Sequence, residues 1–364
     1  VGYIGEETDL RIPSYITQIY KYAFYYCDNL TSVEIPDSVT LIGDYAFLGC
    51  YKLVEVYNKS SLKITVGSSN NGYAGCYALA IYTAPYKSKL SNDNGYITYT
   101  VGEEKILVGY NGKERDLVLP SYITQIYECA FYNCDRLTGV VIGDSVTSIG
   151  DFAFKGCRNL TSVIIGDSVT SIGYEAFYEC YSLTNVVIGD NVTSIGDSAF
   201  RYCSSLKSVV IPDSVLTIEC LHLNVNTTKE AHHGAFEGCQ FLTEVIIGNG
   251  LKTISRETFK DCSSLKTLVI GDSVTTIELY AFENCSSLEI LNIGSSVQSI
   301  GNQAFRNCTT LSEINFSSSV KTIGDYSFEK CSSLASVSIP GNVQTIGNGA
   351  FWGCSGLKSV NLNE

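Results

Sequence analysis

The chain has 364 residues, of which 45% are hydrophobic and 17% charged, so it can bury a large core and is not expected to be disordered. Its formal net charge of -13 and pI near 4.8, without a basic stripe, argue against nucleic acid and anionic lipid as partners. No run approaches the roughly 18 apolar residues that cross a bilayer, so membrane insertion is not expected.

A 23-residue unit recurs along most of the chain. Its marker is the pentapeptide Ala-Phe-x-x-Cys, which aligns Cys27, Cys50, Cys134, Cys157, Cys180, Cys203, Cys239, Cys262, Cys285, Cys308, Cys331 and Cys354. In one copy the apolar positions are Leu160, Val163, Ile165, Val169, Ile172, Ala176, Phe177 and Cys180. A single such unit cannot bury its apolar side alone, so consecutive units are expected to stack.

The spacing within the unit predicts one coil of a β-solenoid. Val163 and Ile165 alternate with outward-facing neighbours, which predicts a short strand, and the following Gly-Asp-Ser is typical of a turn. We therefore expect parallel strands about 4.8 Å apart and interior columns of equivalent phenylalanines and cysteines.

The signatures L-x-x-V-x-I, V-x-x-I-G and A-F-x-x-C resemble the BspA-like leucine-rich repeats of bacterial surface proteins. The resemblance implies a leucine-rich-repeat solenoid, a curved right-handed stack of 23-residue coils with a parallel sheet on the concave face. It also implies an extracellular or cell-surface location and a role in adhesion or host interaction. Fold is indicated much more specifically than ligand.

Two interruptions divide the predicted array. We expect N-terminal coils over residues 1–56, an irregular insert with a β-hairpin over 57–116, and the main array over 117–364 with a loop insertion at 220–232. The hairpin is predicted for residues 96–101 and 105–110 around Gly102-Glu103-Glu104, and a further strand is considered for 62–66.

A duplication suggests that the chain is a fragment of a longer protein. Residues 1–27 match residues 108–134 at 19 of 27 positions, so the first residues correspond to the second strand of the predicted hairpin. We expect the array to continue upstream and the fragment to be monomeric.

Metal sites are weighed at two places. Cys220, His222, Glu230 and His232 include zinc donor types, but their spacing fits no standard site, so a solvated loop is preferred and His222 and His232 are only weak candidates. A series of turn aspartates could hold calcium, but turn capping is preferred because Ser295, Ser318 and Gly341 replace it in the last coils. The series is Asp37, Asp144, Asp167, Asp190, Asp213 and Asp272.

The cysteines are interpreted as reduced packing residues, because twelve of the fifteen recur at an apolar corner of the coil. Parallel Cβ vectors in stacked coils also favour free thiols over disulfides. The sequence contains no nucleophile elbow, phosphate loop or C-x-x-C pair, so neither an enzyme nor a cofactor is expected. A hydrolase within residues 72–99 is kept as a remote alternative.

One candidate binding surface is an apolar row on the outer side of the strands. Its members are Val141, Ile164, Val187, Val210, Ile246 and Val269. Exposed aliphatic patches mark interaction surfaces, but branched residues also stabilise a sheet through cross-strand contacts, and the sequence favours neither reading.

A second candidate is an aromatic edge inside the pentapeptide, formed by Tyr132, Tyr178, Tyr202 and Trp352. Such rings offer rigid contact area to proteins and sugars, although tyrosine is abundant here and Trp352 could simply shield the last coil. The leading hypothesis is a non-catalytic module that binds a host or neighbouring-cell protein or glycan. The alternative is a structural spacer within a larger surface protein, with no ligand of its own.

Overall fold

The computed structural model describes residues 8–220 and 233–362 of the chain. They form two compact units, Val1–Gly112 with Glu128–Ala130, and Lys113–Tyr127 with Phe131–Glu364. Residues 1–3, which repeat 108–110 in sequence, and most of the predicted loop 220–232 lie outside the described residues.

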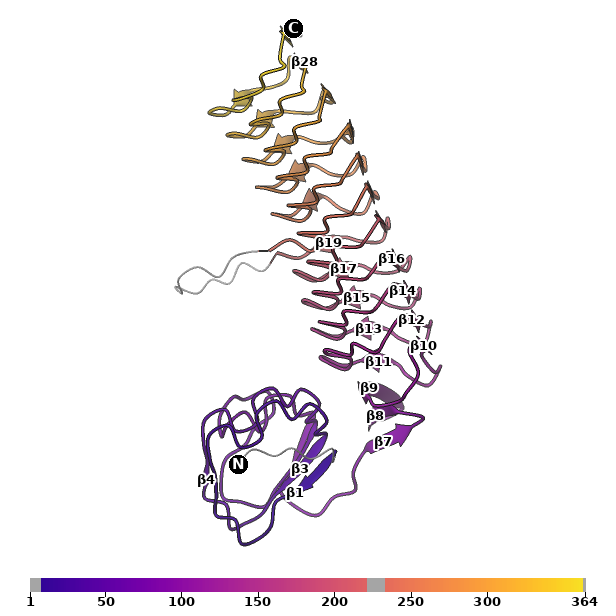
Figure 1. Cartoon of the computed structure of the whole chain (residues 1–364), viewed down its shortest axis with the longest axis vertical. Coiled ribbons are helices and arrows are strands. Elements are labelled where there is room, and N and C mark those ends of the chain that lie inside the picture. The colour runs from indigo at the N-terminus through magenta and orange to yellow at the C-terminus, as the bar shows by residue number, and fades with distance from the viewer. Residues whose placement is uncertain (1–7, 221–232, 363–364) are drawn as a thin grey trace. The chain divides into compact units, whose positions relative to one another are not determined.

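The second unit is a stack of coils, each with a longer strand, a short strand and a run of turns (Figure 1). The longer strands form three parallel sheets: β10 (Asp116–Val118), β12 (Gly139–Ile142), β14 (Ser162–Ile165) and β16 (Asn185–Val187); β18 (Ser208–Ile211), β20 (Glu244–Ile247), β22 (Thr267–Ile270) and β24 (Ile290–Asn292); β26 (Glu313–Asn315), β28 (Ser336–Ile339) and β30 (Ser359–Leu362). The short strands form ladders of their own: β11 (Gln125–Ile126), β13 (Ser148–Ile149), β15 (Ser171–Ile172), β17 (Ser194–Ile195) and β19 (Thr217–Ile218); β21 (Thr253–Ile254), β23 (Thr276–Ile277), β25 (Ser299–Ile300), β27 (Thr322–Ile323) and β29 (Thr345–Ile346).

The strand register follows the sequence period. Val163 lies opposite Val186, which is 23 residues later, and both side chains are buried. Ile164, between the inward-facing Val163 and Ile165, is exposed. Period-two alternation thus places one row inside and one row outside along the stacked strands. The predicted parallel β-solenoid is confirmed.

The phenylalanines of the pentapeptide form a continuous interior column from Phe131 to Phe351. Neighbouring rings are nearly parallel, with centroid distances from 4.7 Å to 5.5 Å. The backbone holds this spacing, because the N–H of each phenylalanine donates to the carbonyl of the next coil, as from Phe177 to Ala199 at 2.7 Å. The predicted column of aromatic side chains is therefore present.

The pentapeptide cysteines form a second column, and all fifteen cysteines of the chain are free. Ten of the pentapeptide thiols donate to the phenylalanine carbonyl of the preceding coil, as Cys180 Sγ does to Phe154 O at 3.2 Å. Complete burial raises the pKa of the Cys180 thiol well above its usual value. The interpretation of these residues as reduced core thiols is confirmed, and the thiol hydrogen bond adds a reason for cysteine at this corner.

The first unit contains coils and an antiparallel segment. Its longer strands pair in parallel in the order β1 (Asp9–Arg11), β3 (Ser32–Ile35), β5 (Glu55–Asn58) and β6 (Ala80–Tyr82), beside the short pair β2 (Gln18–Ile19) and β4 (Leu41–Ile42). The antiparallel strands are β7 (Leu90–Asp93), β8 (Tyr96–Val101) and β9 (Glu104–Tyr110).

The predicted hairpin is β8 and β9, turning at Gly102, which adopts a φ of 63°. The sequence pattern did not predict β7, which pairs with β8. It also did not predict that β6 pairs in parallel with β5, and this pairing makes residues 59–82 a further, degenerate coil. It lacks the Ala-Phe-x-x-Cys pentapeptide, but Ile64, Ala74 and Ala78 still fill the core. The strand considered at 62–66 is absent, since irregular backbone lies between a bend at Leu62 and a turn at Val66.

Candidate functional site

The strand register brings the apolar row together on the second unit. Val141 lies opposite Ile164, and Ile164 opposite Val187; in the next sheet Val210 lies opposite Ile246. Ile246 in turn lies opposite Val269. The row includes Val118 of β10, 70% exposed and opposite Val141, which sequence reasoning omitted because its coil follows the irregular insert.

Among the six residues predicted for this row, the central three are the most exposed. Ile164, Val187 and Val210 are 44%, 47% and 54% exposed, while Val141, Ile246 and Val269 are half-buried. The row ends at β24, where Asn292 pairs with Val269.

A series of exposed aspartates follows the row at the turn that ends each of several strands. In each, Oδ1 accepts the backbone N–H of the equivalent residue in the next coil: Asp144 from Asp167 at 3.0 Å, Asp167 from Asp190 at 3.0 Å, and Asp213 from Asn249 at 2.6 Å. The same bond from Ser295 lowers the pKa of Asp272 below its usual value. These carboxylates cap turns, which is the interpretation preferred from the sequence. Each one caps the turn of the next coil and not its own. They also leave a line of negative charge beside the apolar row.

The structure joins only part of the predicted aromatic edge. Tyr178 and Tyr202 meet edge to face with centroids 5.7 Å apart, and the Arg201 guanidinium lies 4.3 Å from the Tyr202 ring centre. Tyr132 lies two coils earlier in the sequence. Trp352 is 60% exposed in the coil of the last pentapeptide, and Lys330 Nζ lies 5.9 Å from its ring centre.

Between these aromatic residues runs a ladder of alternating charge that sequence reasoning missed. It occupies the first variable position of the pentapeptide, at Arg201, Glu237, Lys260, Glu283, Arg306 and Glu329. The nearest N–O distances are 3.0 Å for Arg201 with Glu237, 3.7 Å for Lys260 with Glu283, 3.2 Å for Arg306 with Glu283 and 3.0 Å for Arg306 with Glu329. Comparing the residues at this position across the aligned copies of the repeat would have revealed the alternating charges.

The acidic members of this ladder are buried, and burial changes the pKa of Glu283. The carboxylates of Glu237, Glu283 and Glu329 are less than a tenth exposed. The pKa of Glu283 is raised by burial, which outweighs the opposing effects of Lys260 and Arg306. Such ladders set the pairing of coils more readily than they bind ligands.

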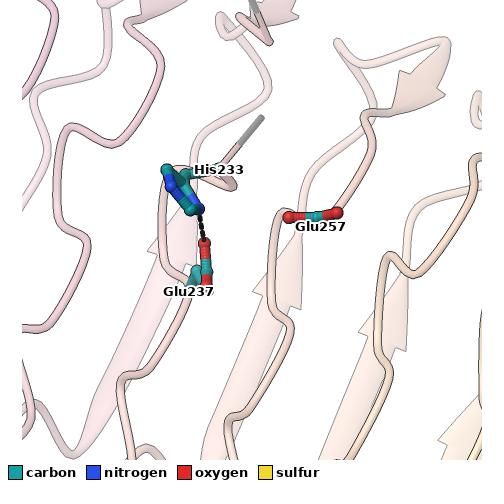
Figure 2. Close-up of side chains that lie close together, drawn as sticks. All are labelled: His233, Glu237 and Glu257. Carbon is teal, nitrogen blue, oxygen red and sulfur yellow. Dashed lines mark hydrogen bonds and ion pairs between the residues drawn. The ribbon is translucent and has the colours of Figure 1, made fainter. Parts of the chain in front are cut away.

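One cluster has the donor types of a metal site. Figure 2 shows His233 and Glu237 pointing toward one another with Glu257 on the adjacent coil, and their donor atoms lie within 4.8 Å. His233 Nδ1 is 2.9 Å from Glu237 Oε2, however, and Arg201 pairs with the same carboxylate.

Glu257 is also paired, with Arg256 Nε at 3.1 Å and Lys260 Nζ at 3.9 Å. Both carboxylates of the cluster are thus already neutralised by basic side chains, which makes it an ion-pair network. The weak candidates His222 and His232 lie outside the described residues.

The structure reveals a cavity in the first unit that sequence reasoning did not identify. It has a volume of about 470 Å³, and its walls are the outer face of β1, β3 and β5 and the segment 85–97. The strands contribute Asp9, Arg11, Ser32, Glu34 and Tyr57. The segment contributes Pro85, Tyr86, Ser88, Leu90, Ser91, Asn92 and Ile97. No local sequence motif marks it, because its two walls are distant in sequence.

Tyrosines organise one end of this cavity. Tyr82 and Tyr86 stack with centroids 3.7 Å apart, and Tyr57 meets Tyr86 edge to face at 5.4 Å. The Tyr82 and Tyr99 hydroxyls are 3.2 Å apart. Burial, followed by the negative charges of Glu55 and Asp9, raises the pKa of Tyr86 to about 12.

Comparisons with known proteins identify the repeat. A family profile described as "BspA type Leucine rich repeat region (6 copies)" matches residues 6–92, 110–224 and 229–358. In a comparison with curated proteins, none matches the chain significantly. The family description names a repeat and no catalytic activity.

Several solved structures are similar. A leucine-rich repeat protein from Bacteroides ovatus is 26% identical with a TM-score of 0.57, over 97% of this chain and 86% of that one. A leucine rich cell surface protein from Faecalibacterium prausnitzii is 24% identical with a TM-score of 0.35, over 77% and 96%. The pneumococcal vaccine antigen PcpA is 18% identical with a TM-score of 0.42, over 77% and 83%.

In the described ranges, no helix is long and apolar enough to cross a membrane. The 23-residue parallel coils, the phenylalanine and cysteine columns and the profile match over most of the sequence agree on one assignment. The chain belongs to the BspA-type leucine-rich repeat family.

Proposed function

We propose that the chain is a non-catalytic binding module, displayed on the cell surface or secreted, that recognises a protein partner through the strand face of its second unit. The observation that carries this proposal is the exposed aliphatic row centred on Ile164, Val187 and Val210. Large apolar side chains aligned on a solvent-facing sheet form the kind of continuous patch that marks an interaction surface.

The chemistry beside the row defines the partner further. Exposed Asp144, Asp167, Asp190 and Asp213 border it, within a chain of formal net charge -13. A complementary protein surface would place apolar side chains on the row and lysine or arginine over the aspartates, because charge complementarity speeds association and excludes acidic partners.

The test is binding of the full chain to an immobilised panel of purified extracellular proteins that spans acidic and basic isoelectric points. We expect selective, salt-sensitive binding to basic members. Val187→Lys combined with Val210→Lys should weaken it at least about tenfold, since charges would replace the centre of the apolar contact. The matched control is Leu216→Lys with Ile346→Lys, which changes two equally exposed apolar residues outside the row.

The folded state of each variant is checked by circular dichroism. Binding that survives the row variant, or falls equally in the control, would dismiss the row as the recognition surface.

A second candidate function is a rigid spacer that holds another domain of a longer protein. The uninterrupted phenylalanine column favours it, because stacked coils with a shared core resist bending. Under this alternative no member of the panel binds. The row would then act only through cross-strand contacts, and the row variant would lose stability without losing any ligand.

A further inference from the structure

We propose that the cavity of the first unit, between β1, β3 and β5 and segment 85–97, is a binding site for a neutral saccharide. This site lies on the first unit and does not depend on the protein-binding function proposed for the second. The argument rests on its size, its lining, its charge and the rigidity of its walls.

The size suits a small ligand and not a macromolecular surface. At about 470 Å³ it falls within the range of roughly 300–1,000 Å³ typical of small-molecule sites. One wall is a pleated strand face, whose side chains are fixed by the coil stack, and the other is the extended segment that leads into β7.

The lining combines hydroxyl, amide and aromatic groups. Its polar lining residues are Thr8, Thr31, Ser32, Ser88, Ser91 and Asn92. The hydroxyls of Thr31, Ser32 and Ser88 already donate to Thr8 O, Asp9 and Glu55, so they offer a ligand acceptor lone pairs. Tyr57 and Tyr86, both half-buried, add ring surface with a polar tip. Sugars present hydroxyl edges together with apolar C–H faces, so a wall that alternates short polar side chains with aromatic rings matches them on both counts.

The charge of the cavity disfavours anionic ligands. Among the described residues that line it, the single cation is Arg11, whose Nε is 4.0 Å from the Asp9 carboxylate. The other charged lining residue, Glu34, is paired with Lys59 at 2.5 Å. Glu55 lies buried behind the wall. A phosphate, a sulfated sugar or a carboxylate would meet net negative charge here, whereas an uncharged polyol would not.

The walls are held in place before any ligand arrives. The Glu55 carboxylate, fully buried on β5, accepts the Ser88 hydroxyl at 2.6 Å and the Lys89 backbone N–H at 2.8 Å. The Tyr82–Tyr86 stack fixes the same segment from the side of β6. Preorganised walls lower the entropy cost of binding, which matters for weakly bound, flexible ligands such as sugars.

The experiment screens the full chain on an array of neutral oligosaccharides that end in glucose, galactose, mannose or N-acetylglucosamine. Sulfated and sialylated glycans and a lysine-rich peptide serve as competing probes. The best neutral oligosaccharide is then titrated by calorimetry. We expect it to bind in preference to the anionic glycans and the peptide.

Two cavity variants locate the site. Tyr57→Ala removes a ring from the wall, and Arg11→Ala removes a lining side chain that is 78% exposed. Each should lower the association constant, Tyr57→Ala by about tenfold or more. Tyr15→Ala, a tyrosine 80% exposed and outside the cavity, is the matched control and should bind as the unchanged protein does.

Three results would each overturn the proposal: no neutral saccharide binds, the anionic glycans or the peptide bind in preference, or saccharide binding persists unchanged in both cavity variants. The row variant Val187→Lys with Val210→Lys should leave saccharide binding intact. Failure of one proposal is therefore distinguishable from failure of the other.

Discussion

The phenylalanine column predicts how stability is distributed along the second unit. Phe177 is fully buried, and its ring lies 5.0 Å from both Phe154 and Phe200. Phe177→Ala removes this ring from between two neighbours whose spacing is fixed by backbone bonds, such as that from Phe177 N to Ala199 O. The cavity cannot collapse readily, so the loss should reach about 3–5 kcal/mol of local unfolding free energy.

Because each coil contacts only its neighbours, the costs of two Phe→Ala substitutions should add only when the coils are far apart. Phe154→Ala and Phe177→Ala share one gap, so their combined cost should depart from the sum by about 0.5–3 kcal/mol. Phe177→Ala and Phe305→Ala lie several coils apart and should add to within about 0.5 kcal/mol.

Hydrogen exchange of peptides from each coil is the suitable assay, because long repeat arrays need not unfold in one step and a single midpoint is then undefined. The control is Phe241→Ala, since Phe241 is 63% exposed and its loss should stay within about 0.5 kcal/mol. If Phe177→Ala weakens protection no more than this control, the column is not the source of stability.

Three further predictions follow from the buried thiols and charges. Cys27, whose pKa is lowered by the hydrogen bond with Cys50, should be alkylated by iodoacetamide in the native protein well before Cys180, whose pKa burial raises; peptide mass spectrometry that found equal rates would contradict the burial argument. Arg306→Met removes a partly exposed cation 3.2 Å from the Glu283 carboxylate. It should lower the local unfolding free energy of its coil by about 2 kcal/mol, less than for a fully buried pair because solvent screens it; unchanged hydrogen-exchange protection of that coil would refute this. Because the folded pKa of Glu283 is raised, its ionisation opposes folding, so stability relative to Glu283→Gln should fall as pH rises from the unfolded pKa through the folded one. Hydrogen-exchange protection of the same coil in mildly acidic and mildly alkaline buffer, corrected for the intrinsic exchange rate, tests this sign, and a rise would contradict it.

Local pattern determined most of the coil. The alternation at Val163 and Ile165 and the recurring Phe177 and Cys180 specify which side chains face inward, because every coil presents the same problem of burying one apolar side. The hairpin also followed from local alternation on either side of Gly102. The outward row was predictable too, since the strand period fixes both faces at once.

Tertiary structure alone decided the features that join residues without a shared motif. The coil over residues 59–82 lacks the pentapeptide, and the pairing of β6 with β5 is what defines it as a coil. The cavity depends on β1, β3 and β5 meeting segment 85–97, and on Glu55 binding Ser88 more than thirty residues away. A repeat encodes contacts between equivalent positions one period apart, so periodicity reveals them in the sequence; an insert's contacts with the coils have no period, and only the folded chain shows them.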